Sequence, residues 1–162
     1  MDIAFFIFLS SGLFLGWSLG ANDAANIFGT AVGTRMVKFR TAAVIASFFI
    51  ILGAVYAGAG ASKTLGDLGN VNAIAGAFMV AFSAALTVYW MVGSGIPVST
   101  SQAIVGAIVG WNLYSGKTTD IGVLSKIVST WAICPALSGV IAIFLYYIIK
   151  IVLKHSKIHL VR

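Results

Sequence analysis

Long runs of apolar residues dominate the pattern of hydrophobic and polar positions along this chain of 162 residues. A helix needs about 20 mainly apolar residues to cross a hydrocarbon core of roughly 30 Å. The first run has no basic residue before it, and further runs follow, so we interpret it as a membrane span rather than a signal peptide. Four runs have the required length, at residues 3–21, 41–61, 73–92 and 127–149.

A fifth segment, residues 97–113, is apolar in its second half but begins with the polar string Ser99, Thr100, Ser101 and Gln102. Counted as an interrupted span, it makes five crossings of the membrane. As a re-entrant hairpin it would leave four crossings. Both alternatives remain open, and five crossings is the preferred interpretation because it agrees with the charges described below.

The composition is typical of an integral membrane protein, with 60% hydrophobic and 9% charged residues. The net charge is +6, but the basic residues fall mainly outside the apolar runs, which indicates topology rather than nucleic-acid binding. We predict an all-α, multi-pass protein of the inner or plasma membrane, with residues 1–162 forming one transmembrane domain within the lipid bilayer.

The distribution of Lys and Arg predicts the orientation, because short loops rich in these residues stay in the cytoplasm. With five crossings, an outer N-terminus and a cytoplasmic C-terminus, seven of the ten basic residues lie inside, and residues 150–162 form a basic cytoplasmic tail. His155 and His159 belong to this tail and have no acidic or thiol companion there, so they do not indicate a metal site. We expect the outer loops to hold the other three basic residues, Lys63, Lys117 and Lys126.

An odd number of crossings means that a second copy of the same unit would be inserted upside down, as in inverted-repeat transporters. Neither conspicuous motif of this chain is repeated within it. Five helices also leave little room for a solute pathway. We therefore expect one repeat of such a transporter and a partner half, which is a second chain, another copy of this one, or a C-terminal repeat.

The first polar motif surrounds Asp23, near the middle of an apolar stretch that runs from residue 3 to residue 32. A carboxylate at membrane depth costs about 2.5 to 3.5 kcal/mol on insertion scales, so it needs a partner or a water-filled cavity. Asn22 and Asn26 flank it, and a helix break at Gly20 would add free carbonyl oxygens. This oxygen-rich group favours a hard cation such as Na+, or a proton on the carboxylate, over a structural Asp that only joins helices.

The second polar motif is a helix start that follows Gly93, Gly95 and Pro97. We expect Pro97 to begin this helix, where its missing amide donor costs nothing. The free N–H groups of a helix N-terminus bind anions, and the hydroxyls of Ser99, Thr100 and Ser101 add further donors. A helix start capped by Ser or Thr without a ligand is the alternative.

Together the motifs have the parts of a cation-coupled anion site, in which a helix N-terminus faces the anion and oxygen atoms hold the cation. The sequence resembles the PiT family of inorganic phosphate transporters at residues 20–33 (GANDAANIFGTAVG) and 97–110 (PVSTSQAIVGAIVG). The resemblance covers nearly the whole chain and corresponds to the N-terminal half of a family member.

The resemblance implies a symporter that moves inorganic phosphate with Na+, or with H+ in some members, and that is built from two inverted repeats and is often dimeric. It implies that the phosphate contacts Asn22, Asp23, Asn26, Ser99, Thr100, Ser101 and Gln102. It implies that Na+ contacts Asn22, Asp23, Asn26, Ser99 and Thr100.

Three alternatives to Na+-coupled phosphate symport remain. These are proton-coupled phosphate transport, a sulfate permease of the same fold, and a membrane subunit that transports nothing. An enzyme is not expected, because no nucleophile with a base and no cluster of metal ligands can be assembled from the sequence. We expect no cofactor other than the coupling ion.

Overall fold

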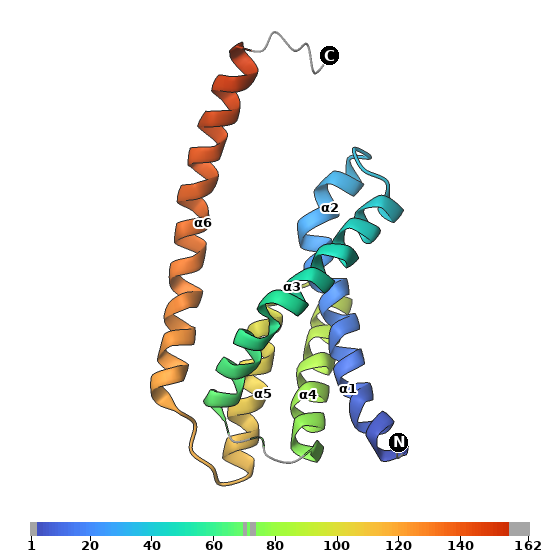
Figure 1. Ribbon diagram of the computed structural model, residues 1–162, viewed down its shortest axis with the longest axis vertical. Helices are drawn as coiled ribbons and strands as arrows, with labels where there is room; N and C mark the ends of the chain where they lie inside the picture. Colours follow the sequence, from blue (N-terminus) through green and yellow to red (C-terminus); the bar gives the residue numbers. More distant parts are fainter. Residues whose placement is uncertain (1–2, 70, 72–73, 156–162) are drawn as a thin grey trace. The chain divides into compact units, whose positions relative to one another are not determined.

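The computed structural model describes residues 3–69, 71 and 74–155, and these residues contain helices and no strands. The all-α class predicted from the sequence is confirmed for this part of the chain. The elements are α1 (Ile3–Leu19), a π-helical turn η1 (Gly20–Ala24), α2 (Ala25–Gly33), α3 (Phe39–Leu68), α4 (Ile74–Gly93), α5 (Thr100–Tyr114) and α6 (Ile121–His155) (Figure 1).

The chain divides into two units, residues 1–120 and residues 121–162. The described part of the second unit is the single helix α6, which has 35 residues and continues through Pro135. Its apolar side chains are exposed, among them Ile133, Leu137 and Phe144. Such a helix has the length and composition of a membrane span, and lipid or other protein segments must cover its apolar surface.

Helix α4 is the centre of the first unit and lies between α1 and α5 (Figure 1). Its buried positions recur on one face and are mostly small, which allows helix backbones to approach closely in a membrane. On α1, the buried Ser18 donates its hydroxyl to the carbonyl of Ala85 on α4, at 3.3 Å. The buried residues of α4 are Gly76, Val80, Ala84, Ala85 and Val88.

Two glycines allow α5 to pack closely against the first turn of α4 and against the residue that follows α3, at the lower ends of these helices in Figure 1. A Cβ atom on Gly76 of α4 would lie 2.7 Å from the Trp111 ring of α5. A Cβ atom on Gly69, directly after α3, would lie 2.5 Å from Ile108 Cγ2 of α5. Helix α5 is thus held by glycine contacts at the end opposite its N-terminus.

The ends of α4 and α5 are also set by glycine. Gly95 has φ 75° and Gly116 has φ 66°, in the left-handed region that favours glycine. After α4, Gly95 N–H donates to the carbonyl of Val92, and Ile96 N–H donates to that of Met91. This is the Schellman arrangement, which satisfies the last carbonyls of a helix and turns the chain sharply.

Among the described residues, four helical segments are long and apolar enough to cross a membrane, and each overlaps one of the four predicted runs. Helix α5 has 15 residues, or about 22 Å at 1.5 Å per residue. With the non-helical residues 96–99 before it, the segment can reach about the thickness of the hydrocarbon core, which agrees with an interrupted span.

Two expectations about boundaries are wrong. Lys63 lies inside α3 and Lys126 inside α6 rather than in loops, because both helices continue beyond their apolar runs. Pro97 does not begin α5, which starts at Thr100 because Ser99 provides the cap. The predicted basic tail, residues 150–162, begins inside α6, and residues 156–162 lie outside the described part.

We predict that Gly76→Ala destabilises the first unit, because the added methyl group collides with the Trp111 ring. Overpacking of this kind costs about 1 to 3 kcal/mol. The measurement is thermal unfolding in detergent, followed by tryptophan fluorescence. Gly53→Ala in α3 is the matched control, because a Cβ atom there meets nothing within 4 Å. Equal melting temperatures for the two variants would contradict the close packing of α4 and α5.

Candidate functional site

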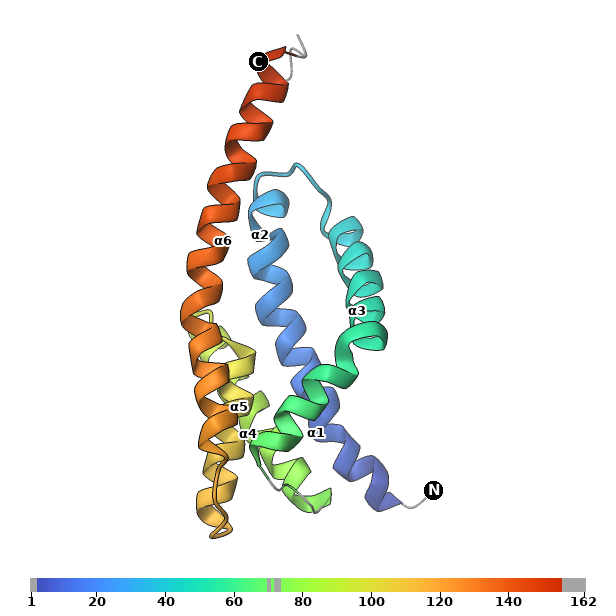
Figure 2. The same ribbon diagram turned by 60° about the vertical axis from the view of Figure 1, so that its left-hand side comes forward.

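The first motif lies on a π-helical turn within one continuous helical segment. The expected break at Gly20 does not occur, because the chain stays helical from α1 through η1 into α2 (Figure 2). A π-helical turn holds one more residue per turn than the surrounding helix and is frequent at functional sites. Asn22 in this turn is buried, with 3% of its surface exposed, and Asp23 is half-buried.

The side-chain amide of Asn22 joins the two motifs. Its Nδ2 donates to the carbonyl of Val98 at 2.5 Å, and its Oδ1 accepts from the N–H of Val98 at 3.2 Å. Val98 lies in the extended segment before α5, where no helix provides partners for its backbone. One side chain therefore pairs both polar groups of a backbone residue 76 positions away.

Asn22 also positions the carboxylate. Its Nδ2 donates a second hydrogen bond to Asp23 Oδ1 at 2.7 Å. Because a carboxamide has two N–H donors, the pairs with Val98 and Asp23 use both of them. Only an Oδ1 lone pair remains for a ligand, whereas Asp23 keeps its Oδ2, which has no hydrogen-bond partner among the described residues.

The other predicted residue of this motif, Asn26, lies in the first turn of α2 and is exposed. Within the described residues its side chain makes no hydrogen bond. It therefore takes no part in the hydrogen bonds of the Asn22–Val98 pair, although the two Asn residues are only four positions apart. A role for Asn26 in ligand binding stays a prediction.

The second motif forms the N-terminus of α5. The Ser99 hydroxyl caps the helix by accepting from the N–H of Gln102 at 3.3 Å. The first N–H bonded within the helix is that of Ala103, which donates to the Ser99 carbonyl. The N–H groups of Thr100 and Ser101 precede it and have no partner inside the helix, as is general for the first turn.

The side chains of this turn differ in exposure. Thr100 is 4% exposed, and its Oγ1 has no hydrogen-bond partner in the described part of the chain. Ser101 and Gln102 are exposed. An unpaired buried hydroxyl costs about 1 to 3 kcal/mol, so Thr100 Oγ1 is a polar group that a ligand or water would satisfy.

The motifs thus meet at one place, as the sequence predicts. Asn22 contacts Val98, and α5 begins two residues after Val98, so the carboxylate-bearing turn lies next to a helix N-terminus. Sequence reasoning missed the π-helical turn and the backbone of Val98 as the partner of Asn22. The only signal for the pairing is an Asn at membrane depth, which must find a partner.

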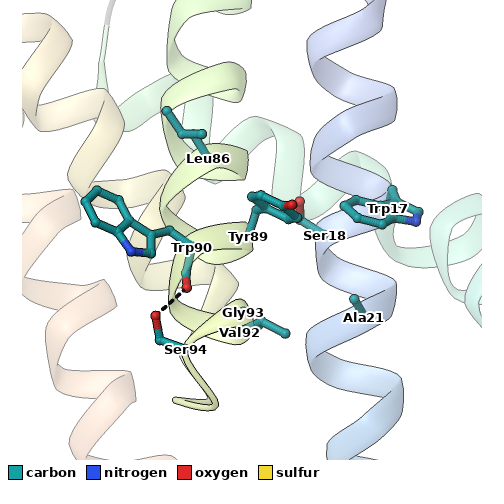
Figure 3. Close-up of a pocket in the computed structure, with 9 residues that line it drawn as sticks. All are labelled: Trp17, Ser18, Ala21, Leu86, Tyr89, Trp90, Val92, Gly93 and Ser94. Carbon is teal, nitrogen blue, oxygen red and sulfur yellow. Dashed lines mark hydrogen bonds between the residues drawn. The ribbon is translucent and has the colours of Figure 1, made fainter.

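A cavity of about 630 Å³ borders both motifs without containing their predicted site residues (Figure 3). It lies between α1 and the last turns of α4, and its walls are largely aromatic, with the Trp17 and Tyr89 ring centroids 5.7 Å apart. Ser94 on its rim donates its hydroxyl to the Trp90 carbonyl (Figure 3). No charged residue lines this cavity, and its surface is mainly apolar, so the polar motifs beside it are the better candidates for binding ions.

The phosphate transporter family model matches residues 19–161, which include both motifs. The chain belongs to this family. The resemblance to the N-terminal half of PiT family members is thereby confirmed, and the protein is a multi-pass membrane protein of a transporter family rather than an enzyme family.

Named relatives agree with this assignment. The chain is 36% identical over 143 residues to the sodium-dependent phosphate transporter 1 of Rattus norvegicus, covering 80% of this chain and 21% of the relative. It is 35% identical over 144 residues to the Mus musculus protein of the same name, covering 81% and 21%. It is 32% identical over 151 residues to the chloroplastic inorganic phosphate transporter 2-1 of Arabidopsis thaliana, covering 86% and 26%.

The chain spans less than half the length of such relatives, with 29% of a Mycobacterium bovis relative and 45% of a Methanocaldococcus jannaschii relative covered. No solved structure matches the chain.

We predict that Asn22→Ala destabilises the protein by about 1 to 3 kcal/mol, because it leaves the N–H and carbonyl of Val98 without partners. Asn26→Ala is the matched control, since the exposed Asn26 makes no hydrogen bond among the described residues. Thermal unfolding in detergent measures both. A melting temperature of Asn22→Ala equal to that of the control would show that the Asn22–Val98 pair contributes nothing.

Proposed function

We propose that this chain forms one half of a cation-coupled symporter of inorganic phosphate, with Na+ as the coupling ion. The observation that carries the proposal is the Asn22–Val98 pair, which joins the motif of the half-buried Asp23 to a helix N-terminus. Family membership supports phosphate as the substrate. The rat and mouse relatives are named sodium-dependent, which supports Na+.

The phosphate side of the proposed site is the first turn of α5. Two N–H groups without helical partners, the unpaired Thr100 hydroxyl and the exposed Ser101 and Gln102 side chains offer neutral donors. A helix N-terminus carries roughly half a positive charge, so an anion can bind there without Arg or Lys. Phosphate that keeps a proton can also donate a hydrogen bond to Asp23.

The cation side of the proposed site is Asp23 with neighbouring oxygen atoms. Hard cations such as Na+ prefer oxygen ligands, and Asp23 Oδ2 supplies a negative charge. Asn26, Ser99 and Thr100 remain candidate ligands. Asn22 acts mainly as the residue that positions Asp23 and Val98, with one lone pair left for the ion. Coupling to H+ instead would require Asp23 to carry the proton.

The remaining half of the site comes from a partner, which is a C-terminal repeat, another chain or a second copy. Asn26, Ser101 and Gln102 are exposed although they belong to segments of membrane depth. Polar side chains there face a bundle interior or a water-filled path rather than lipid. We further propose an outer N-terminus, a cytoplasmic C-terminus and a homodimer of complete transporters.

Asp23→Asn is expected to lower Na+-driven phosphate uptake into proteoliposomes at least tenfold, because the amide removes the charge that holds the cation. The experiment starts with this chain reconstituted alone. Uptake by the wild type would then show that two copies of the chain can form a complete site. Phosphate binding in detergent is measured in parallel, with Na+ or choline present. This measurement still tests Asp23 if uptake requires a partner chain. Asp67→Asn, at the end of α3, is the matched control.

Three results would contradict the proposal. Na+-dependent uptake or binding at the wild-type level in Asp23→Asn would remove Asp23 from the cation site. Phosphate binding that depends on pH but not on Na+ would assign the coupling to protons. Absence of phosphate binding and uptake, in well-folded protein, would favour the subunit that transports nothing.

A sulfate permease is the second candidate, because the donors on α5 recognise a tetrahedral anion by geometry. Phosphate differs from sulfate at neutral pH by its remaining proton, which can bond to Asp23 Oδ2. We therefore expect tenfold excess sulfate to leave phosphate binding unchanged within twofold. Displacement of phosphate by an equal concentration of sulfate would favour the sulfate permease.

A further inference from the structure

A groove of about 590 Å³ lies between α2 and α3, on the side of the π-helical turn that faces α3. The two helices leave the connection at residues 34–38 side by side, and Figure 2 shows them at the upper right of the first unit. The groove, here named the α2–α3 groove, is within the range of about 300 to 1,000 Å³ that holds small ligands. Its apolar walls include Gly20, Ala24, Phe28, Ala43, Ala46 and Ile50.

The groove lies between two apolar helices, so we expect an apolar occupant. Both helices belong to segments that are long and apolar enough to span a membrane. Small side chains on both sides keep the helices from filling the space between them, and Ala43 and Ala46 are only half-buried. A hydrocarbon chain is the occupant that a bilayer supplies to such a space.

One end of the groove carries positive charge. Gly33 and Phe39 line this end, and the connection between them carries Arg35 and Lys38, with Arg40 in the first turn of α3. All three basic side chains are exposed. The four acidic residues of the chain are at positions 2, 23, 67 and 120, so none lies between residues 24 and 66 to neutralise them.

We propose that the α2–α3 groove binds an anionic phospholipid, with an acyl chain between the helices and the phosphate group at Arg35, Lys38 and Arg40. Charge complementarity selects an anionic over a zwitterionic headgroup, since basic groups between spanning helices attract phosphate headgroups. The far end of the groove is lined by Gly20, Ala21 and Ala24, so the acyl chain reaches the turn that carries Asn22. The lipid site is independent of the transported substrate.

The test is lipid retention by the whole chain, purified in a neutral detergent and measured by native mass spectrometry. Phosphatidylglycerol and phosphatidylcholine with identical acyl chains are added separately. We expect the wild type to retain phosphatidylglycerol at least fivefold more than phosphatidylcholine, and to keep it when inorganic phosphate is added at 100-fold excess.

The charge variant combines Arg35→Gly, Lys38→Gln and Arg40→Gln, and we expect it to lose the preference for phosphatidylglycerol. Arg35 has φ 61°, where glycine is favoured, so this substitution relieves backbone strain rather than adding it. The matched control removes three positive charges elsewhere, by Lys63→Gln, Lys126→Gln and Lys150→Gln, and retains the preference.

The groove variant is Ala46→Leu, which fills the space between the helices, and we expect it to retain at least fivefold less of either lipid. Ala59→Leu, on a part of α3 that does not line the groove, is its control. Thermal unfolding of each variant tests whether a loss of bound lipid comes from a loss of the folded structure.

Three outcomes would overturn the proposal. One is equal retention of both lipids by the wild type, and another is displacement of the lipid by inorganic phosphate. The third is a disulfide between Ala46→Cys and Cys134 of α6, the single natural cysteine, in native membranes. Such a disulfide would show that α6, from the same or another copy, occupies the groove.

Discussion

The pairing of Asn22 with the backbone of Val98 is the interaction on which the site depends. Gly95 turns the chain out of α4, and α5 begins only at Thr100, so no helix provides partners for the N–H and carbonyl of Val98. Unpaired backbone groups at membrane depth cost several kcal/mol each. The carboxamide of Asn22 satisfies the N–H and carbonyl of Val98 together, and it thereby fixes where α5 begins.

The π-helical turn explains why Asn22 and Asn26 have different surroundings. Residues four apart share a face of a regular α-helix. In this segment Asn22 is buried against Val98 and Asn26 is exposed. The extra residue of a π-helical turn shifts the register of everything after it. The same insertion leaves Asp23 half-buried, between the Asn22 amide and the open side of the helix.

Length and hydropathy were sufficient to predict the four long spans, because apolar runs at membrane depth have no other stable conformation than a helix. The ends of the helices were less predictable. Helix α3 continues to Leu68, beyond the apolar run that ends at residue 61, because residues 61–68 contain no proline or other strong helix-ending signal. The two polar motifs were predictable as partners because both are too polar for lipid. The Val98 contact and the π-helical turn were not predictable, because no residue type in the sequence specifies either of them.

The same hydrogen bonds constrain how a transporter built on this unit can move. Any displacement of the α5 N-terminus relative to η1 must break both bonds to Val98, and each buried group left unpaired costs about 1 to 3 kcal/mol. At the other end, Ile108 and Trp111 of α5 pack against Gly69 and Gly76 in contacts too close for a methyl group. Helix α5 is therefore fixed at both ends within the first unit. For the half-transporter proposed above, we therefore expect access to alternate by movement of the partner half against this unit, with Asn22 and Val98 staying together.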